Sequence, residues 1–228
     1  MKLSFEGHSC FQLENAQCVK ILIDPFITDN PLCSKSWKDF DPDIILITHG
    51  HMDHMEDALV IARNSNATIV SISDLIYSLD CAGIKTEGIN MGGTVVIKSV
   101  SVTMVQAWHG STTFSKGGVY GGLACGYIIR TDGLCIYHAG DTALFGDMGN
   151  VISRYNIDYA LLPIGDYFTM GPQDAVLAAQ WLKAKTVIPM HYNTFPVIKQ
   201  DVNQFKQELE SKTQSRCLII APQNTIEI

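Results

Sequence analysis

A short, continuous apolar run at residues 44–47 leads directly into four potential metal ligands within six residues. The run Ile-Ile-Leu-Ile, bounded by Asp43 and Thr48, has the length and β-branching of a strand that is buried on both faces. Strands of that kind occur in sheets that are covered by other layers, so the run indicates a layered α/β fold. Because loops at strand ends often carry functional side chains, the ligands that follow mark the expected site.

The rest of the chain alternates short strands with amphipathic helices. Strands are predicted at residues 2–6, 10–13, 19–23, 43–48, 68–72, 124–130, 134–138, 158–162 and 186–190, with two or three more within 94–107 and a final pair at 217–221 and 225–228. Helices are predicted at about 55–63, at 73–82 with Ser73 as N-cap, at 172–182, and after an N-cap at Asp201. The glycine-rich stretch 116–122 is expected to be a mobile loop.

This order of elements runs from strands to mixed strand–helix units, and then repeats. It predicts two sheets packed face to face with helices outside, as one domain spanning residues 1–228. A hydrophobic content of 46% against 17% charged residues suits one sizeable core.

Composition also limits the partners. The formal net charge of −7 disfavours long nucleic acids and anionic membranes, both of which need a basic surface. No apolar run approaches the roughly 20 residues that span a bilayer, and the first residues alternate like a strand instead of forming an apolar leader. Seven irregularly spaced cysteines are interpreted as reduced thiols. We therefore expect a cytoplasmic protein that acts on a small molecule, and a homo-oligomeric state is left open.

The run from Thr48 to His54, Thr-His-Gly-His-Met-Asp-His, is the strongest chemical signal. His49 and His51 are two residues apart in a turn, so both can face one ion. Asp53 and His54 are adjacent at a helix start and can face a second ion nearby. Imidazole and carboxylate ligands together suit zinc, manganese, iron or nickel. Asp53 could instead form a capping box with a Glu three residues later, but that reading leaves the three histidines unexplained.

Three further candidate ligands follow predicted strands. These are His109, Asp141 in a Gly-Asp-Thr sequence, and His191 in Met-His-Tyr-Asn. A single histidine at a strand end is more often a hydrogen-bonded surface residue. Taken together with the first cluster, the three residues complete two metal sites.

These residues resemble the five-motif pattern of the metallo-β-lactamase superfamily. They are most similar to the UPF0173 metal-dependent hydrolases, a branch related to ascorbate-6-phosphate lactonase. Further markers of that branch lie at residues 7–11, 24–26, 137–142, 162–166, 169–172 and 190–196, so the resemblance covers nearly the whole chain. It implies an αββα sandwich with the metals at one edge. It also implies a first site of His49, His51 and His109, a second site of Asp53, His54 and His191, and Asp141 as the bridge.

The implied activity is hydrolysis by a hydroxide that bridges two divalent metal ions, with zinc expected first and manganese, nickel or iron as alternatives. Asp53 and Asp141 would orient the nucleophile. The bond could belong to an ester or lactone, or to a phosphodiester. One alternative is a catalytically inactive metal-binding regulatory or scaffold protein, and another is an iron-dependent oxidoreductase.

Five other residues are weaker candidates. His8 is interpreted as a catalytic proton donor or substrate contact, or else as a structural histidine at a strand end. His138 is expected to orient a ligand. Tyr192 and Asn193 could stabilise an oxyanion or could serve packing and the turn. Asp166 could support a ligand or belong to a loop.

Overall fold

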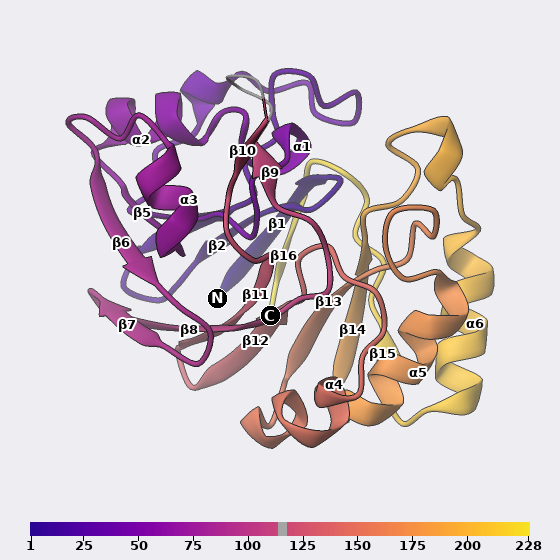
Figure 1. Cartoon of the computed structure of the whole chain (residues 1–228). Helices are drawn as coiled ribbons and strands as arrows, with labels where there is room; N and C mark the ends of the chain where they lie inside the picture. The colour runs from indigo at the N-terminus through magenta and orange to yellow at the C-terminus, as the bar shows by residue number, and fades with distance from the viewer. Residues whose placement is uncertain (114–117) are drawn as a thin grey trace.

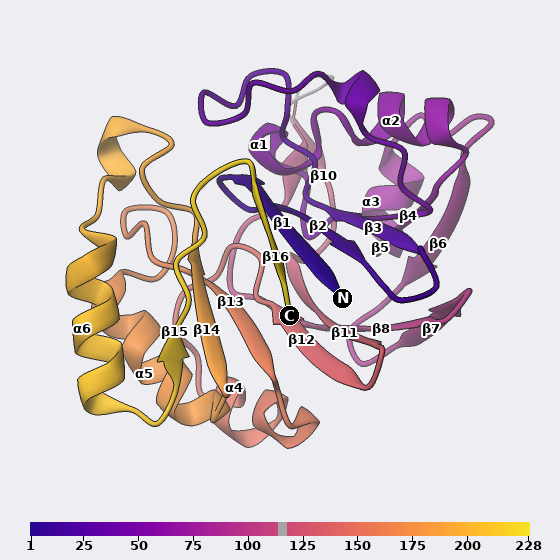
Figure 2. The ribbon, with the colours of Figure 1, turned by 180° about the vertical axis from the view of Figure 1, so that it is seen from behind.

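Two seven-stranded sheets pack face to face with helices on both outer surfaces (Figures 1 and 2). The computed structural model describes residues 1–113 and 118–228. In spatial order, the first sheet contains β16 (Asn224–Glu227), β1 (Lys2–Gly7), β2 (Cys10–Glu14), β3 (Lys20–Ile23), β4 (Ile44–Leu46), β5 (Thr68–Ile72) and β6 (Lys85–Ile89). The second contains β15 (Arg216–Cys217), β14 (Thr186–Met190), β13 (Tyr159–Pro163), β12 (Leu134–His138), β11 (Cys125–Thr131), β8 (Val100–Gln106) and β7 (Thr94–Ile97).

Helices cover the two sheets from outside (Figure 1). The first sheet is covered by α2 (Ala58–Ser65) and α3 (Ser73–Ser78), while α1 (Met52–Met55) lies at its upper edge. The second sheet is covered by α5 (Pro172–Leu182), against which α4 (Asp147–Asn150) and α6 (Val202–Lys212) pack. Short 3-10 helices occupy Trp37–Asp39, Ile152–Tyr155 and Pro196–Ile198, and a small hairpin joins β9 (Thr112–Thr113) to β10 (Val119–Tyr120). The predicted αββα sandwich is confirmed.

The core lies between the two sheets. All three residues of β4 have no exposed surface, as expected for a strand covered on both faces. Tyr127 of β11 joins the sheets, because its Oη atom lies 2.7 Å from the carbonyl oxygen of Ile47 and 3.2 Å from that of Val70. The amide of Cys125 also donates to the carbonyl of Thr48 at 3.0 Å. These contacts fix the end of β4 against the start of β11.

The directions of the strands determine where the predicted site lies. In the first sheet, β1 is antiparallel to β2, β2 is antiparallel to β3, and β3, β4 and β5 are parallel, so β1 runs with β3 to β5. In the second sheet, β8 runs with β12, β13 and β14 by the same reasoning. The carboxyl ends of all these strands therefore meet at one edge, where open α/β sheets usually bind ligands.

Several predicted elements differ from the structure. The helix expected at 55–63 is broken into α1 and α2, because the carboxylate of Asp57 accepts the amides of Ile27 and Thr28 while its own amide donates to Pro25. The helix expected at 73–82 ends at Ser78, and its N-cap is the preceding residue instead of Ser73. Strand β6 was not predicted.

The expected final strand pair is wrong. Strand β15 pairs with β14, and β16 pairs with β1, so the chain crosses from one sheet to the other between them. The two termini meet as a result, with the amino group of Met1 3.2 Å from the carbonyl oxygen of Ile228. Of the stretch 116–122, residues 116 and 117 lie outside the described residues, and 119–120 form β10. Across the described ranges, no helix is long and apolar enough to cross a membrane.

Candidate metal centre

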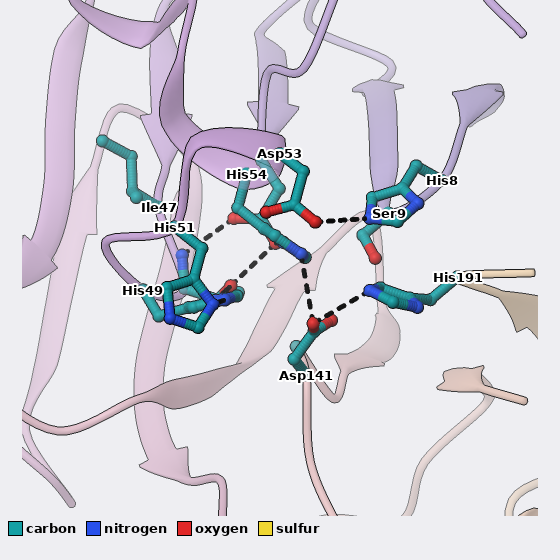
Figure 3. A network of polar contacts seen from close by, with 12 residues as sticks. His8, Ser9, Ile47, His49, His51, Asp53, His54, Asp141 and His191 are labelled. Carbon is teal, nitrogen blue, oxygen red and sulfur yellow. Dashed lines mark hydrogen bonds and ion pairs between the residues drawn. The ribbon is translucent and has the colours of Figure 1, made fainter. Parts of the chain in front are cut away.

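The seven predicted ligands converge at the shared edge of the two sheets. Figure 3 labels all of them except His109. His49 and His51 follow β4, Asp53 and His54 belong to α1, and His109, Asp141 and His191 follow β8, β12 and β14. Each comes from the carboxyl end of a strand or from the helix directly after one. The parallel directions of these strands therefore bring together residues up to 142 positions apart, from His49 to His191.

One group of donors consists of His49, His51 and His109. Their ligand atoms all lie within 4.8 Å of one another. The Nε2 atom of His49 is 3.1 Å from Nδ1 of His51, and Nε2 of His109 is 3.3 Å from the same atom. Burial lowers the pKa of all three imidazoles. The rings are therefore neutral near pH 7, and neutral imidazole is the form that binds metals.

A second group contains Asp53, His54 and His191 together with His8. Its ligand atoms also lie within 4.8 Å of one another. His8 has no exposed surface, and its Nε2 atom is 3.2 Å from Oδ2 of Asp53. Burial first, and then the neighbouring His191, lowers the pKa of His8 to about 4. Although burial opposes it, the contact with His8 lowers the pKa of Asp53, so this carboxylate stays ionised.

Asp141 lies between the two groups. Its Oδ2 atom is 2.9 Å from Nε2 of His191, 3.3 Å from Nε2 of His54 and 3.7 Å from Nε2 of His109. Burial would raise the pKa of Asp141, but the charges of His191 and His54 lower it well below its ordinary value. A buried, ionised carboxylate that faces both groups is placed as a bridging ligand would be.

Unsatisfied polar atoms test whether these residues fit a metal. Within the described part of the chain, the buried atoms Nε2 of His54, Nε2 of His191 and Oδ1 of Asp141 make no hydrogen bond of ordinary geometry, although the two nitrogens lie 3.3 Å and 2.9 Å from Oδ2 of Asp141. Buried polar atoms are almost always paired, since an unpaired one costs about 1–3 kcal/mol. Nitrogen and oxygen donors that point at one another without a shared hydrogen bond fit a cation between them. The donor set therefore fits metal ions with His and Asp ligands.

Asp24 is a supporting residue that the sequence reasoning missed. Its Oδ2 atom accepts from the hydroxyl of Thr48 at 2.7 Å and lies 2.8 Å from Nδ1 of His54, while Oδ1 accepts the amide of Thr48 at 2.8 Å. Burial opposes protonation of His54, but Asp141 and Asp24 raise its pKa well above the ordinary value. The available sequence signal was the Asp-Pro pair directly after the predicted strand at 19–23.

His138 supports the loop that carries Asp141. Its Nε2 atom donates to the carbonyl of Ser9 at 3.0 Å, and the amide of Gly140 donates to its Nδ1 at 3.2 Å. Both ring nitrogens are thus engaged with the backbone. His138 holds the turn before Asp141 and not the carboxylate itself.

The remaining candidates make contacts with loops. Tyr192 is buried, and burial followed by the effect of Cys217 raises its pKa to about 12. The side chain of Asn193 accepts the amide of Gln200 at 2.8 Å, which closes the turn after His191. Asp166 is exposed and stands in a turn, where its amide donates to the carbonyl of Met170 at 3.0 Å and its carbonyl accepts the amide of Thr169 at 2.9 Å. Tyr192 belongs to the hydrophobic core and Asn193 closes a turn, so both are placed as packing and turn residues would be.

Comparison with known proteins finds relatives over the whole chain. A model of the β-lactamase superfamily domain matches residues 2–191. A UPF0173 metal-dependent hydrolase of Pelotomaculum thermopropionicum is 45% identical over 231 residues, covering 100% of both chains. Another, from Methanosphaera stadtmanae, is 50% identical over 216 residues, covering 93% of this chain and 92% of the relative.

Among solved structures, Igni18, a metallo hydrolase from Ignicoccus hospitalis, superposes with a TM-score of 0.88 and 39% identity, covering 100% of this chain and 98% of that one. The specific relationship to ascorbate-6-phosphate lactonase stays a prediction. The superfamily match over most of the chain and the full-length relatives settle the family, and the chain belongs to the metallo-β-lactamase superfamily as a UPF0173 metal-dependent hydrolase.

Proposed function

We propose that this hydrolase binds two divalent metal ions side by side and cleaves an ester or lactone bond of a small substrate. The observation that carries the proposal is the position of Asp141, whose Oδ2 atom approaches ring nitrogens of both donor groups. One ion would be held by His49, His51 and His109, and the other by Asp53, His54 and His191.

The donor chemistry favours zinc, with manganese, nickel and iron as alternatives. Two such ions, when bound, supply Lewis acidity and lower the pKa of a water from about 15.7 toward about 7. Asp53 and Asp141 would orient the attacking oxygen and balance the positive charge. We also propose a cytoplasmic location, because all seven cysteines are free thiols.

Exposed aromatic side chains on the surrounding loops support the choice of substrate. Trp108, Tyr167 and Phe168 are 62%, 72% and 50% exposed. The loop of Trp108 and the loop of Tyr167 and Phe168 are both hydrogen-bonded to Thr142, the residue after Asp141. Aromatic groups beside a polar centre typically bind the apolar part of a ligand. They favour a substrate with an aryl or alkyl substituent.

The first experiment is elemental analysis of protein purified without chelator, for the wild type and for Asp141→Asn. We expect about two ions per chain in the wild type and a clear loss in the variant. Asp158→Asn is the matched control, since Asp158 accepts an amide at the opposite end of the same strand, β12, and should leave the metal content unchanged.

The metal found then sets the conditions for a panel of aryl esters, alkyl esters, lactones and bis(p-nitrophenyl) phosphate. Turnover of esters or lactones above the phosphodiester supports the proposal, and the opposite order contradicts the bond type. One ion in both proteins would contradict the bridging role of Asp141. Two ions without turnover of any substrate class would favour the regulatory or scaffold alternative.

A further inference from the structure

His8 occupies the tight turn between β1 and β2, at the same edge as the metal centre (Figure 3). Its φ of 57° is in the left-handed region, which an L residue adopts at a cost and which is often found at functional sites. The carbonyl of His8 accepts the amide of His191 at 2.7 Å. The N-terminal turn is therefore attached directly to the backbone of a candidate ligand.

Both nitrogens of the His8 ring have polar partners. Nε2 lies 3.2 Å from Oδ2 of Asp53, and Nδ1 lies 2.9 Å from Oγ1 of Thr194. A carboxylate only accepts hydrogen bonds, so we assign the ring hydrogen to Nε2. Nδ1 is then an acceptor, and the hydroxyl of Thr194 donates to it. The result is a directed chain of hydrogen bonds from Thr194 through His8 to Asp53.

Packing fixes the ring within this chain. His8 has no exposed surface, and its ring centroid is 4.0 Å from that of His191. The rings of Phe26 and Phe195 contact it edge-on, with centroids at 5.6 Å and 5.5 Å. Thr194 is also buried, at 7% exposure. The donor that faces Asp53 is thus held rigidly by apolar neighbours and by one hydroxyl.

Asp53 is the ligand that most needs such support. Its side chain is 34% exposed, whereas that of Asp141 is 3% exposed. It is also carried by α1, a helix of four residues, which is too short to be rigid by itself. A partly solvated carboxylate on a short helix can rotate between water and the metal centre. A fixed N–H donor on Oδ2 removes that freedom. It thereby sets the direction of the other carboxylate oxygen, Oδ1.

We propose that Thr194 and His8 are positioning residues that hold Asp53 in place for the second metal ion. The proposal rests on the two-ion function above and assigns His8 neither to the substrate nor to the metal. Partners of this kind around metal ligands typically change metal affinity or activity by about 10–100-fold when they are removed.

The test measures metals per chain and the affinity of the weaker site, by competition with a chromogenic chelator, in four variants. Thr194→Val removes the hydroxyl at nearly constant volume, and Thr194→Ser keeps it. We expect Thr194→Val to weaken the second ion about tenfold or more, with the first ion unchanged, and Thr194→Ser to match the wild type within about twofold. Thermal unfolding of the metal-free proteins checks that both Thr194 variants remain folded.

His8→Ala and His8→Gln separate positioning from direct ligation. Both substitutions place a non-glycine residue at the same positive φ, so their backbone cost is similar. Glutamine keeps an N–H donor for Asp53 but is a poor metal ligand, so His8→Gln should retain the second ion better than His8→Ala. Equal loss in both would make His8 a ligand and overturn the proposal, and so would equal affinities in the two Thr194 variants. Fewer than two ions in the wild type would overturn the proposed function and this inference with it.

Discussion

The ring of His54 is held between two carboxylates, Asp24 on one side and Asp141 on the other. Oδ2 of Asp24 is 2.8 Å from Nδ1 of His54, and Oδ2 of Asp141 is 3.3 Å from Nε2. Asp24 also accepts the amide and hydroxyl of Thr48, so one carboxylate joins the ends of β3 and β4 and orients the ring. The orientation of His54 is therefore determined by a residue that lies outside the predicted ligand set.

Asp24→Asn should weaken metal binding at the site of His54. The amide side chain cannot accept every hydrogen bond that the carboxylate accepts, so His54 loses its fixed orientation, at a cost of about 10–100-fold in metal affinity or activity. Elemental analysis and kcat/KM measure this loss. Asp43→Asn is the control. Asp43 precedes β4, at the end of the strand away from the site, and accepts the amide of Lys20 there. Full metal content in Asp24→Asn would show that Asp24 has only a structural role.

Thr142→Val should impair the site without removing a ligand. Oγ1 of Thr142 accepts the amide of Trp108 at 2.9 Å, and its hydroxyl donates to the carbonyl of Ala143 at 2.7 Å. Valine leaves the Trp108 amide without this acceptor, which costs about 1–3 kcal/mol if the amide remains buried. We expect a higher KM and lower stability, measured by steady-state kinetics and urea unfolding. Thr142→Ser should retain both properties, and a valine variant that is indistinguishable from it would refute the assigned role.

Gly140→Ala and Gly133→Ala separate backbone strain from steric exclusion. Both glycines have positive φ, 62° and 76°. A Cβ at Gly140 would lie 2.5 Å from the carbonyl oxygen of Cys125, while one at Gly133 meets nothing within 4 Å. Gly133→Ala should cost about 1–2 kcal/mol of stability. Gly140→Ala should cost more and should also lower the metal content, because Asp141 must move. Equal unfolding midpoints for the two variants would contradict this interpretation.

The loss of folding stability at acid pH should depend partly on the carboxylate of Asp158. Its carboxylate accepts the amide of Cys135 at 2.8 Å and is 2.7 Å from Nζ of Lys185. Burial opposes ionisation, but Lys185 and that amide lower the pKa of Asp158 below its ordinary value. A lowered folded-state pKa contributes stability above the unfolded value of about 3.9, and the contribution is lost as the pH falls through the folded value.

Asp158→Asn should therefore lose less stability than the wild type between about pH 5 and pH 3, relative to each protein at pH 7. Urea unfolding at fixed pH steps measures the difference. Lys185→Met should reproduce part of the effect, since it removes the cation but keeps the amide contact. Parallel pH profiles for the wild type and Asp158→Asn would rule out a contribution from this carboxylate.

The sequence alone determined the features that depend on residues close together in the chain. The composition of residues 44–47 is enough to predict a strand buried on both faces, and the spacing of His49, His51, Asp53 and His54 is enough to predict two groups of ligands beside it. Asp201 was predicted as an N-cap for a similarly local reason, because its side chain accepts the amides two and three residues later, both at 3.0 Å.

Only the tertiary structure decided the features that depend on how the strands pair and how the sheets pack. Strands β15 and β16 are close in sequence but join different sheets, since the partners that satisfy their backbone groups are β14 and β1. The roles of Asp24 and Thr194 were hidden for the same reason. Each is an ordinary polar residue in the sequence. Asp24 reaches His54 because β3 and β4 are neighbours in one sheet, and Thr194 reaches His8 because the two sheets pack face to face.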